Sequence, residues 1–211
     1  MKSSLSSVNE FETETQTKQF VLFSLENDLY GVHVEQVIQV QEYKSVTHIP
    51  GAPIYVLGVL NLRGSIITVI NLKKRLHISE DYPEEGTGHV LFTQLGEQTV
   101  GMLVDKVLTL RKIPTSIIKE ELDLISSRIP MEYISGAASL EDEIVVLLNL
   151  QKILSDYEVE QIFREQEKIE HILKEKEKEK VAISQEKLVD LDLEKKTEKR
   201  LKQKRSKKKD T

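Results

Sequence analysis

The chain has 211 residues, contains no cysteine and no tryptophan, and carries a formal net charge of −5. The lack of cysteine excludes disulfide frameworks, cysteine zinc sites and thiol catalysis. The negative charge argues against nucleic-acid binding by the chain as a whole.

Charge and turn residues divide the sequence into two regions. Residues 1–157 carry a net charge of −8 and hold all five prolines and all nine glycines, whereas residues 158–211 carry +3 and hold neither. A long stretch without Pro or Gly that is rich in Glu and Lys is typical of helix or solvated coil. The first 18 residues are expected to be flexible. They lack the apolar core of a secretory signal, and no window is apolar enough to span a membrane, so we expect a soluble, cytoplasmic protein.

The first region is predicted to be rich in β-strands. Residues 20–32 and 89–104 each place two apolar runs on either side of a polar turn, the pattern of a β-hairpin. Residues 66–70 and 144–148 are short runs rich in β-branched residues, which favours buried strands although periodicity alone does not exclude helix. The polar residues 75–88 include one proline and two glycines and are predicted to form a loop between two halves.

These elements occur twice along the chain. YGVHVEQVI at 30–38 aligns with VGMLVDKVL at 100–108, and GVLNLRGSIITVINLKKRL at 58–76 aligns with GAASLEDEIVVLLNLQKIL at 136–154. One copy alone would have a marginal core, so we expect two small barrels that pack against each other.

The two copies differ at one turn. Asn61-Leu62-Arg63-Gly64 in the first copy corresponds to Ser139-Leu140-Glu141-Asp142 in the second. Glycine permits a positive φ and a close approach of another backbone, and arginine presents a planar fork of donors. The Arg-Gly turn is therefore predicted to serve a role that only the first copy has.

Residues 19–154 resemble the CheW family of chemotaxis coupling proteins. The resemblance rests on FVLFSLENDLYGVHVEQV, VTHIPGAPIYVLGVLNLRGSIITVINLKKRL, VGMLVDKV and YISGAASLEDEIVVLLNLQKIL, and most specifically on residues 50–64. It implies an all-β domain over 19–157 with two interlocked five-stranded SH3-like barrels. The residues after this domain, 158–211, lie outside the resemblance and are expected to form a charged tail that is helical or disordered. The resemblance also implies a non-enzymatic scaffold that couples the cytoplasmic tips of transmembrane chemoreceptors to the regulatory domain of a CheA-type histidine kinase, at the membrane-bound receptor array.

In this family a receptor helix packs into an apolar groove between the subdomains, and the resemblance carries this site onto matching positions. They are Val37, Gln39, Gly58, Leu62, Arg63, Gly64, Ile66, Val100 and Gly101. The apolar members have an alternative reading as ordinary core residues, and the glycines at 58 and 64 as turn residues. No position is assigned to kinase binding.

The sequence departs from the family at Gln39, where a Glu commonly pairs with the arginine that corresponds to Arg63. A neutral hydrogen bond would be weaker than that charge-assisted pair. Arg63 therefore either finds another acid, such as Glu42, or is freer to contact a partner.

No catalytic or cofactor motif is present in the sequence. The five histidines show neither HxH nor HxxxH spacing, and G-x-S-x-G and Walker motifs are missing. The carboxylates at 141–143 fall in a predicted turn, where solvation explains them more simply than acid–base work. We expect no enzymatic activity, no metal, no cofactor and no small-molecule substrate.

The tail is predicted to begin as a helix over 156–180. Its apolar residues form a partial stripe at Val159, Ile162, Phe163, Ile169, Ile172 and Leu173. Residues 195–209 hold ten Lys or Arg and one acid, which suits weak contact with anionic lipid headgroups. A disordered solubilising tail is the alternative.

Two other functions compete with the flagellar chemotaxis scaffold. The same kind of adaptor could serve another kinase pathway, such as surface motility. A nucleic-acid-binding barrel with a basic arm is a second alternative. The −8 charge of the first region and its lack of interleaved basic and aromatic residues argue against that alternative.

Overall fold

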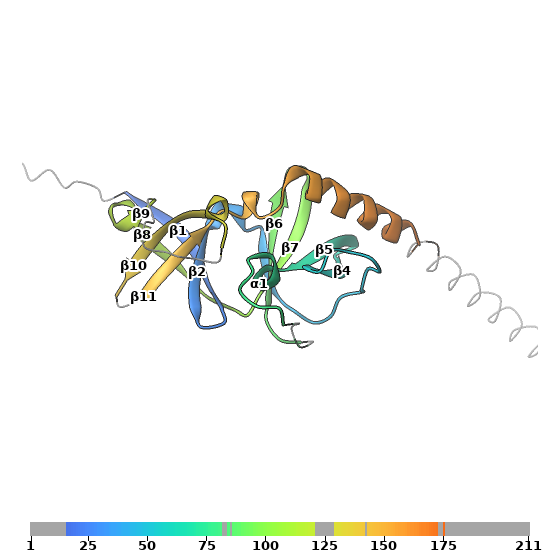
Figure 1. The fold of residues 1–211 in the computed structure, drawn as a ribbon, viewed down its shortest axis with the longest axis horizontal. Coiled ribbons are helices and arrows are strands. Elements are labelled where there is room, and N and C mark those ends of the chain that lie inside the picture. The colour runs from blue at the N-terminus through green and yellow to red at the C-terminus, as the bar shows by residue number, and fades with distance from the viewer. Residues whose placement is uncertain are drawn as a thin grey trace, which may run out of the picture. The chain divides into compact units, whose positions relative to one another are not determined.

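The computed structural model describes residues 16–81, 84, 86–120, 129–141, 143–172 and 175 (Figure 1). It divides into two compact units, residues 1–163 and residues 164–211. The predicted basic stretch at 195–209 and the predicted helix beyond residue 175 lie outside the described residues.

The first unit is built mainly from β-strands, as the sequence predicts. The strands are β1 (Thr17–Leu25), β2 (Asp28–His33), β3 (Gln39–Glu42), β4 (Val56–Leu62), β5 (Ser65–Asn71), β6 (His89–Leu95), β7 (Gln98–Val104), β8 (Lys106–Pro114), β9 (Ile118–Lys119), β10 (Ile134–Leu140) and β11 (Glu143–Leu148). The short helices are η1 (Val34–Gln36), α1 (Leu72–Arg75), η2 (Thr115–Ile117), η3 (Met131–Tyr133) and η4 (Leu150–Lys152). A longer helix, called the C-terminal helix here, covers 156–172.

Both predicted hairpins and both predicted strands are confirmed, although the second strand is only partly buried because Ile144 is 64% exposed. The first hairpin is β1–β2 and the second is β6–β7, while residues 66–70 and 144–148 lie within β5 and β11. The predicted loop begins one residue too early, because Arg75 is still the last residue of α1. Asn71 starts this helix by accepting a hydrogen bond from Lys74 N at its N-cap.

The strands form two sheets that exchange segments. Sheet A has the order β8-β1-β2-β11-β10-β9, and sheet B has the order β3-β6-β7-β5-β4. Strand β3 of the first copy pairs with β6 of the second, and β8 of the second pairs with β1 of the first. Each barrel therefore contains strands from both copies, which is the interlocked arrangement expected. Sheet A has six strands because the two-residue β9 also pairs with β10.

The strand register repeats the alignment found in the sequence. Val69 of β5 lies opposite Gly101 of β7 in a parallel pair, and Leu147 of β11 lies opposite Gly31 of β2 in the equivalent parallel pair. Both positions lack space for a side chain. A Cβ on Gly101 would lie 2.7 Å from Val90 Cγ1, and one on Gly31 would lie 2.9 Å from Leu147 Cδ2.

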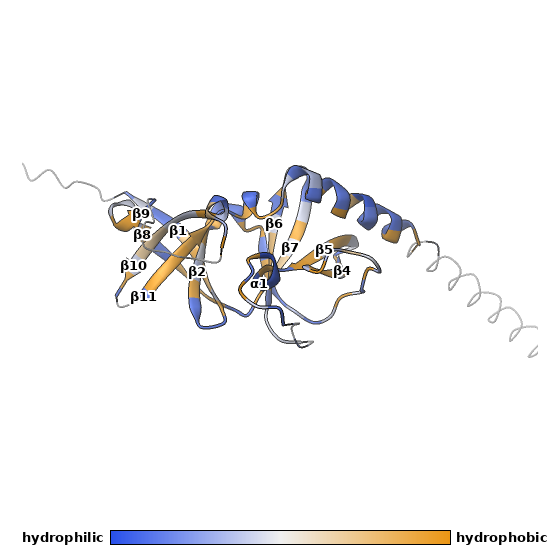
Figure 2. Ribbon diagram, in the orientation of Figure 1, coloured by the Kyte–Doolittle hydropathy of each residue, from blue (hydrophilic) through white to orange (hydrophobic). Residues whose placement is uncertain are grey.

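Each sheet encloses its own apolar core. Sheet B surrounds a cluster that includes Val69, Val90 and Phe92, and sheet A surrounds one that includes Phe20 and Leu147. Figure 2 shows that hydrophobic residues concentrate on the strands of both sheets, whereas the connecting segments are more hydrophilic. Each core combines residues of both copies, as Val69 with Val90 and Phe20 with Leu147 show, so neither copy completes a core alone.

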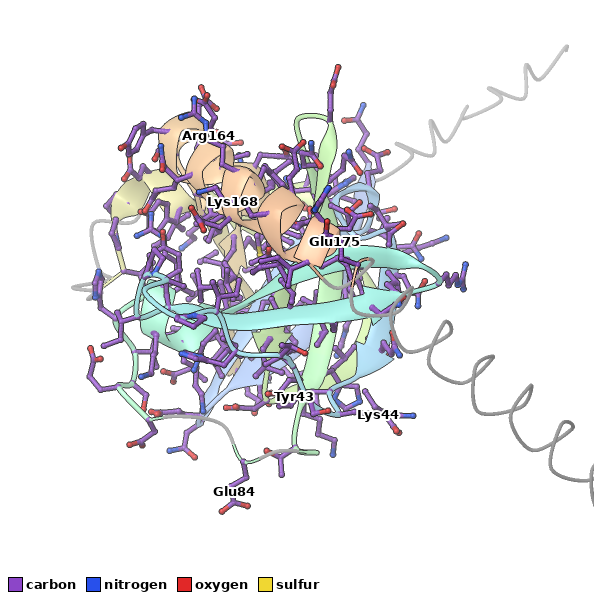
Figure 3. The ribbon with its side chains drawn as sticks, turned by 90° about the vertical axis from the view of Figure 1, so that its right-hand side faces the viewer. Tyr43, Lys44, Glu84, Arg164, Lys168 and Glu175 are labelled. Carbon is purple, nitrogen blue, oxygen red and sulfur yellow. The ribbon has the colours of Figure 1, made fainter. Side chains whose placement is uncertain are left out.

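Sheet B is closed and extended beyond its named strands. Thr47 and Val59 exchange two backbone hydrogen bonds of 2.7 and 2.8 Å, which joins the segment after β3 to β4. The backbone of Tyr43 and Lys44 bonds to the segment that follows Glu84, with Tyr43 N donating to Gly88 O (3.0 Å) (Figure 3). These bonds fix the position of residues 86–88, which end the connection between the two halves.

Candidate partner-binding surface

The β4–β5 turn presents Arg63 to solvent. Leu62 pairs with Ser65, and the two residues between them have positive φ values, 55° for Arg63 and 95° for Gly64. Two successive positive φ values are the signature of a type I′ hairpin turn. Asn61 Oδ1 accepts a hydrogen bond from Gly64 N (2.7 Å), which holds the turn and leaves the exposed Arg63 side chain at its tip.

Arg63 forms neither of the pairings considered for it. Within the described residues it has no ion pair with Glu42 and no hydrogen bond with Gln39. The equivalent turn of the second copy differs, because Glu141 forms an ion pair of 2.8 Å with Arg111. The first alternative, in which Arg63 pairs with another acid, is therefore not seen among the described residues.

The other predicted site residues fall on both faces of sheet B. One row of paired residues crosses all five strands; it consists of Gln39, Phe92, Gly101, Val69 and Gly58. Residues in such a row share one face of a sheet. This row includes members of the inner core cluster, so the two glycines face the barrel interior. Leu62 packs against the same cluster.

The neighbouring row faces the other side of the sheet, which we call the outer face of sheet B. It contains Val59, Thr68, Val100 and Thr93, and Ile66 has the same orientation two residues before Thr68. All five side chains are buried, with exposed fractions of 0 to 8%. The structure therefore places Val100 and Ile66 on a covered face. Val37 lies just before β3 and Gln39 is its first residue, and both are half-buried.

A cluster of polar side chains joins the two barrels to the C-terminal helix. We call it the Arg75 junction; it comprises Tyr55, Arg75, Tyr133, Ser155 and Glu158. The guanidinium of Arg75 donates to Ile153 O (2.7 Å), Tyr133 Oη (2.8 Å) and Glu158 Oε2 (3.0 Å), and it lies over the rings of Tyr55 and Tyr133. One side chain from α1 thus contacts the connection after β11, the turn before β10 and the first turn of the C-terminal helix.

The C-terminal helix begins with a capping box within this junction. Ser155 Oγ accepts from Glu158 N (3.3 Å), and Glu158 Oε2 accepts from Ser155 N (2.9 Å) and Ser155 Oγ (2.8 Å). Tyr55 Oη donates to Glu158 Oε1 (3.0 Å). Because both carboxylate oxygens are bonded, the helix start is held in one position relative to β4.

The surroundings change the pKa values of three groups in the junction. Burial alone would raise the pKa of Glu158, but hydrogen bonds from Ser155 and Tyr55 and the charge of Arg75 outweigh it and lower the pKa below its usual 4.5. Burial and the hydrogen bond to Glu158 raise the pKa of Tyr55 to about 12. Burial likewise raises the pKa of Tyr133.

The lowered pKa of Glu158 predicts an acid-sensitive contribution to stability. Its folded pKa lies below its unfolded value, so the contribution is complete above about pH 4.5 and is lost as pH falls through the folded pKa. Between about pH 5 and pH 3, the free energy of unfolding of Glu158→Gln should fall less than that of the parent protein. Urea unfolding at several pH values measures this slope. If Glu158→Gln keeps the slope of the parent protein, the prediction is wrong.

A comparison with protein families places this fold. A family model described as the CheW-like domain matches residues 19–158, which contain both barrels and the start of the C-terminal helix. The chain belongs to the CheW-like domain family. The match ends where the charged tail begins, so 159–211 lie outside the family's domain.

Named relatives of the CheW-like domain match over the same region. The chemotaxis protein CheW of Klebsiella aerogenes is 28% identical over 155 residues, which are 74% of this chain and 92% of that protein. That of Treponema pallidum is 29% identical over 147 residues, 68% of this chain and 86% of that protein. The crystal structure of the scaffolding protein CheW from Thermoanaerobacter tengcongensis aligns with a TM-score of 0.60 at 28% identity, covering 68% of this chain and 92% of that one.

No group of three or more His, Asp or Glu side chains in the part of the chain that the structure describes could hold a metal ion. Among the same residues, no helix is long and apolar enough to cross a membrane.

The Arg75 junction is the feature that sequence reasoning missed. One of its signals was visible, because Ser155 followed three residues later by Glu158 is the pattern of a capping box. Arg75 itself gave no signal. It ends a run of three basic residues, Lys73 to Arg75, which would ordinarily be expected on a solvated surface.

Proposed function

We propose that this protein is a non-enzymatic chemotaxis scaffold that couples transmembrane chemoreceptors to a CheA-type histidine kinase. The observation that carries the proposal is the CheW-like domain match over both barrels, together with relatives named as chemotaxis proteins and a solved relative named as a scaffolding protein. The protein would then act at the cytoplasmic side of a receptor-containing membrane, with protein partners and no substrate.

The proposed receptor contact centres on the Arg63 turn. Arg63 is exposed, is held by an ordered turn and lacks an ion pair among the described residues. Arginine at such a position can form bidentate bonds with a carboxylate of a partner. Leu62, Ile66 and Val100 would supply apolar contact, with Val37 and Gln39 at the far edge. Gly58, Gly64 and Gly101 would act through backbone shape.

Co-sedimentation tests the coupling function. Receptor-containing membranes and purified kinase are mixed with the full-length protein, and the kinase in the pellet is measured. We expect the pelleted kinase to increase when the protein is present. No increase at protein concentrations of tens of micromolar would contradict the coupling function. Success only with partners from a surface-motility system would assign the scaffold to that pathway.

Arg63→Ala should weaken receptor binding without unfolding the protein. Alanine and arginine bear the same Cβ, so the strain of the positive φ should be unchanged. Loss of an arginine contact at an interface costs about 1–2 kcal/mol, which corresponds to roughly a five- to thirtyfold rise in Kd. Titration of a receptor cytoplasmic fragment measures Kd, and thermal unfolding checks stability. Arg111→Ala is the matched control on sheet A and should bind like the parent; a large drop in Tm for Arg63→Ala would make Arg63 a structural residue.

A further inference from the structure

The outer face of sheet B presents a conflict that the proposed function does not resolve. Val100 and Ile66 are expected to contact a receptor helix, yet both are buried, with exposed fractions of 0 and 8%. Their neighbours Thr68 and Val59 are buried as well. A receptor helix therefore cannot reach this apolar face unless something moves away from it.

The start of the C-terminal helix lies at one end of this face. Glu158 accepts a hydrogen bond from Tyr55, which directly precedes β4, and the carbonyl of Tyr55 accepts from Asn71 N at the end of β5. η4, which leads into the helix, contacts β6. The first helical turn is thus placed beside the strands whose outer side chains are covered.

The first part of the C-terminal helix carries two buried apolar side chains, Ile162 and Phe163. Ile162 follows Glu158 by four residues, so the two lie on the same helix face, about 6 Å apart along the axis. Ile162 and Phe163 are both buried, and both belong to the same compact unit as the barrels. Glu158 is bonded to Tyr55 and Arg75, so Ile162 lies one turn further along the helix face that makes these bonds.

We infer that Ile162 and Phe163 cover the outer face of sheet B near Thr68 and Val100, and that a receptor helix binds by displacing them. This inference rests on the proposed function, because it names the receptor as the competitor. The C-terminal helix would then serve as an internal occupant of the receptor site. Its anchor, the Arg75 junction, would remain in place while the helix beyond it moves.

The present cover leaves a polar atom unsatisfied. Thr93 Oγ1 is buried on the outer face and has no hydrogen-bond partner among the described residues. An unpaired buried hydroxyl is unfavourable. A competing helix that brings a polar side chain to Thr93 would satisfy this hydroxyl, which favours exchange of one helix for another.

Thiol labelling tests the cover without any receptor. Because the chain has no cysteine, Val100→Cys introduces a single reporter on the outer face. Cysteine is a small apolar residue and suits this site. We expect slow labelling in the otherwise unchanged chain and labelling at least about tenfold faster when Ile162→Ala and Phe163→Ala are added. Tyr157→Ala, at an exposed position of the same helix, is the matched control and should label slowly.

A control for folding makes the labelling result decisive. Circular dichroism must show the same thermal unfolding transition of the barrels in all variants, since faster labelling of an unfolded protein would give no information about the helix. If the barrels are folded and Ile162→Ala with Phe163→Ala labels at the slow rate, the inferred cover is wrong.

Receptor binding tests the displacement, using the same substitutions in the chain that retains Val100. A purified receptor cytoplasmic fragment should bind the Ile162→Ala, Phe163→Ala variant about three- to tenfold more tightly than the parent, because less cover has to be displaced. Equal or weaker binding, together with faster labelling, would overturn the displacement. Absence of binding by parent and variant alike would count against the proposed function itself, whereas the labelling result would still decide whether the helix covers the sheet.

Discussion

Replacing Gly58 with alanine is expected to lower the free energy of unfolding by about 3 kcal/mol or more. Gly58 has a φ of 151°, and a Cβ there would collide with the carbonyl oxygen of Thr47 and lie 2.8 Å from its carbonyl carbon. Thr47 is not free to retreat, because its backbone exchanges two hydrogen bonds with Val59 to close the barrel. The substitution must therefore break the closure or distort β4. Urea denaturation followed by circular dichroism measures the loss.

Gly64→Ala is the matched control for Gly58→Ala. It lies in the same hairpin and also has a positive φ, 95°, but a Cβ there would meet no atom within 4 Å. Only the backbone conformation is penalised, so we expect a loss of about 1 kcal/mol. Equal losses at the two positions would show that the approach of Thr47 does not matter. The comparison also distinguishes a structural role of Gly58 from a role in receptor binding. If Gly58→Ala damages the barrel, its reduced receptor binding would reflect that damage and not the loss of a receptor contact.

Replacing Arg75 with leucine should cost about 2–3 kcal/mol of stability. The Arg75 side chain is 15% exposed and that of Glu158 is 26% exposed, so the pair is largely withdrawn from water. Without the guanidinium, Glu158 keeps a partly buried charge, and Ile153 O and Tyr133 Oη each lose a hydrogen bond. Chemical denaturation of Arg75→Leu gives the loss.

An exposed ion pair and a double-mutant cycle control the Arg75 experiment. Arg111 and Glu141 form a pair of similar length, but their side chains are 45% and 78% exposed, so Arg111→Leu should cost less than about 1 kcal/mol. Arg75→Leu combined with Glu158→Gln should cost less than the two single losses added together. Strict additivity would mean that the two residues stabilise the protein independently.

Local patterns in the sequence were sufficient to locate most of the strands. Alternating apolar residues around polar turns predicted β1–β2 and β6–β7, because hairpin pairing is decided by neighbours in the chain. The internal repeat also predicted which positions of the two copies are structurally equivalent. Gly58 and Gly136 align in the sequence, and in the structure both have a φ near 150° and face a carbonyl oxygen of an adjoining segment.

The candidate site was predictable where turn chemistry determines it. An Arg-Gly pair between two apolar runs indicated an exposed hairpin turn, and Arg63 lies at the tip of one. The sequence could not show which face of sheet B each apolar residue occupies. Gly101 and Val100 are adjacent in the chain, but their positions alternate between the barrel interior and the outer face.

Residue order and local periodicity were sufficient to predict most of the strands, the repeat and the family resemblance. The tertiary structure decided the burial of Val100 and the role of Arg75. Arg75 stands 58 residues from Tyr133 and 83 from Glu158. Its side chain becomes buried because exchanged strands bring those partners together, and such long-range contacts leave no pattern among neighbouring residues.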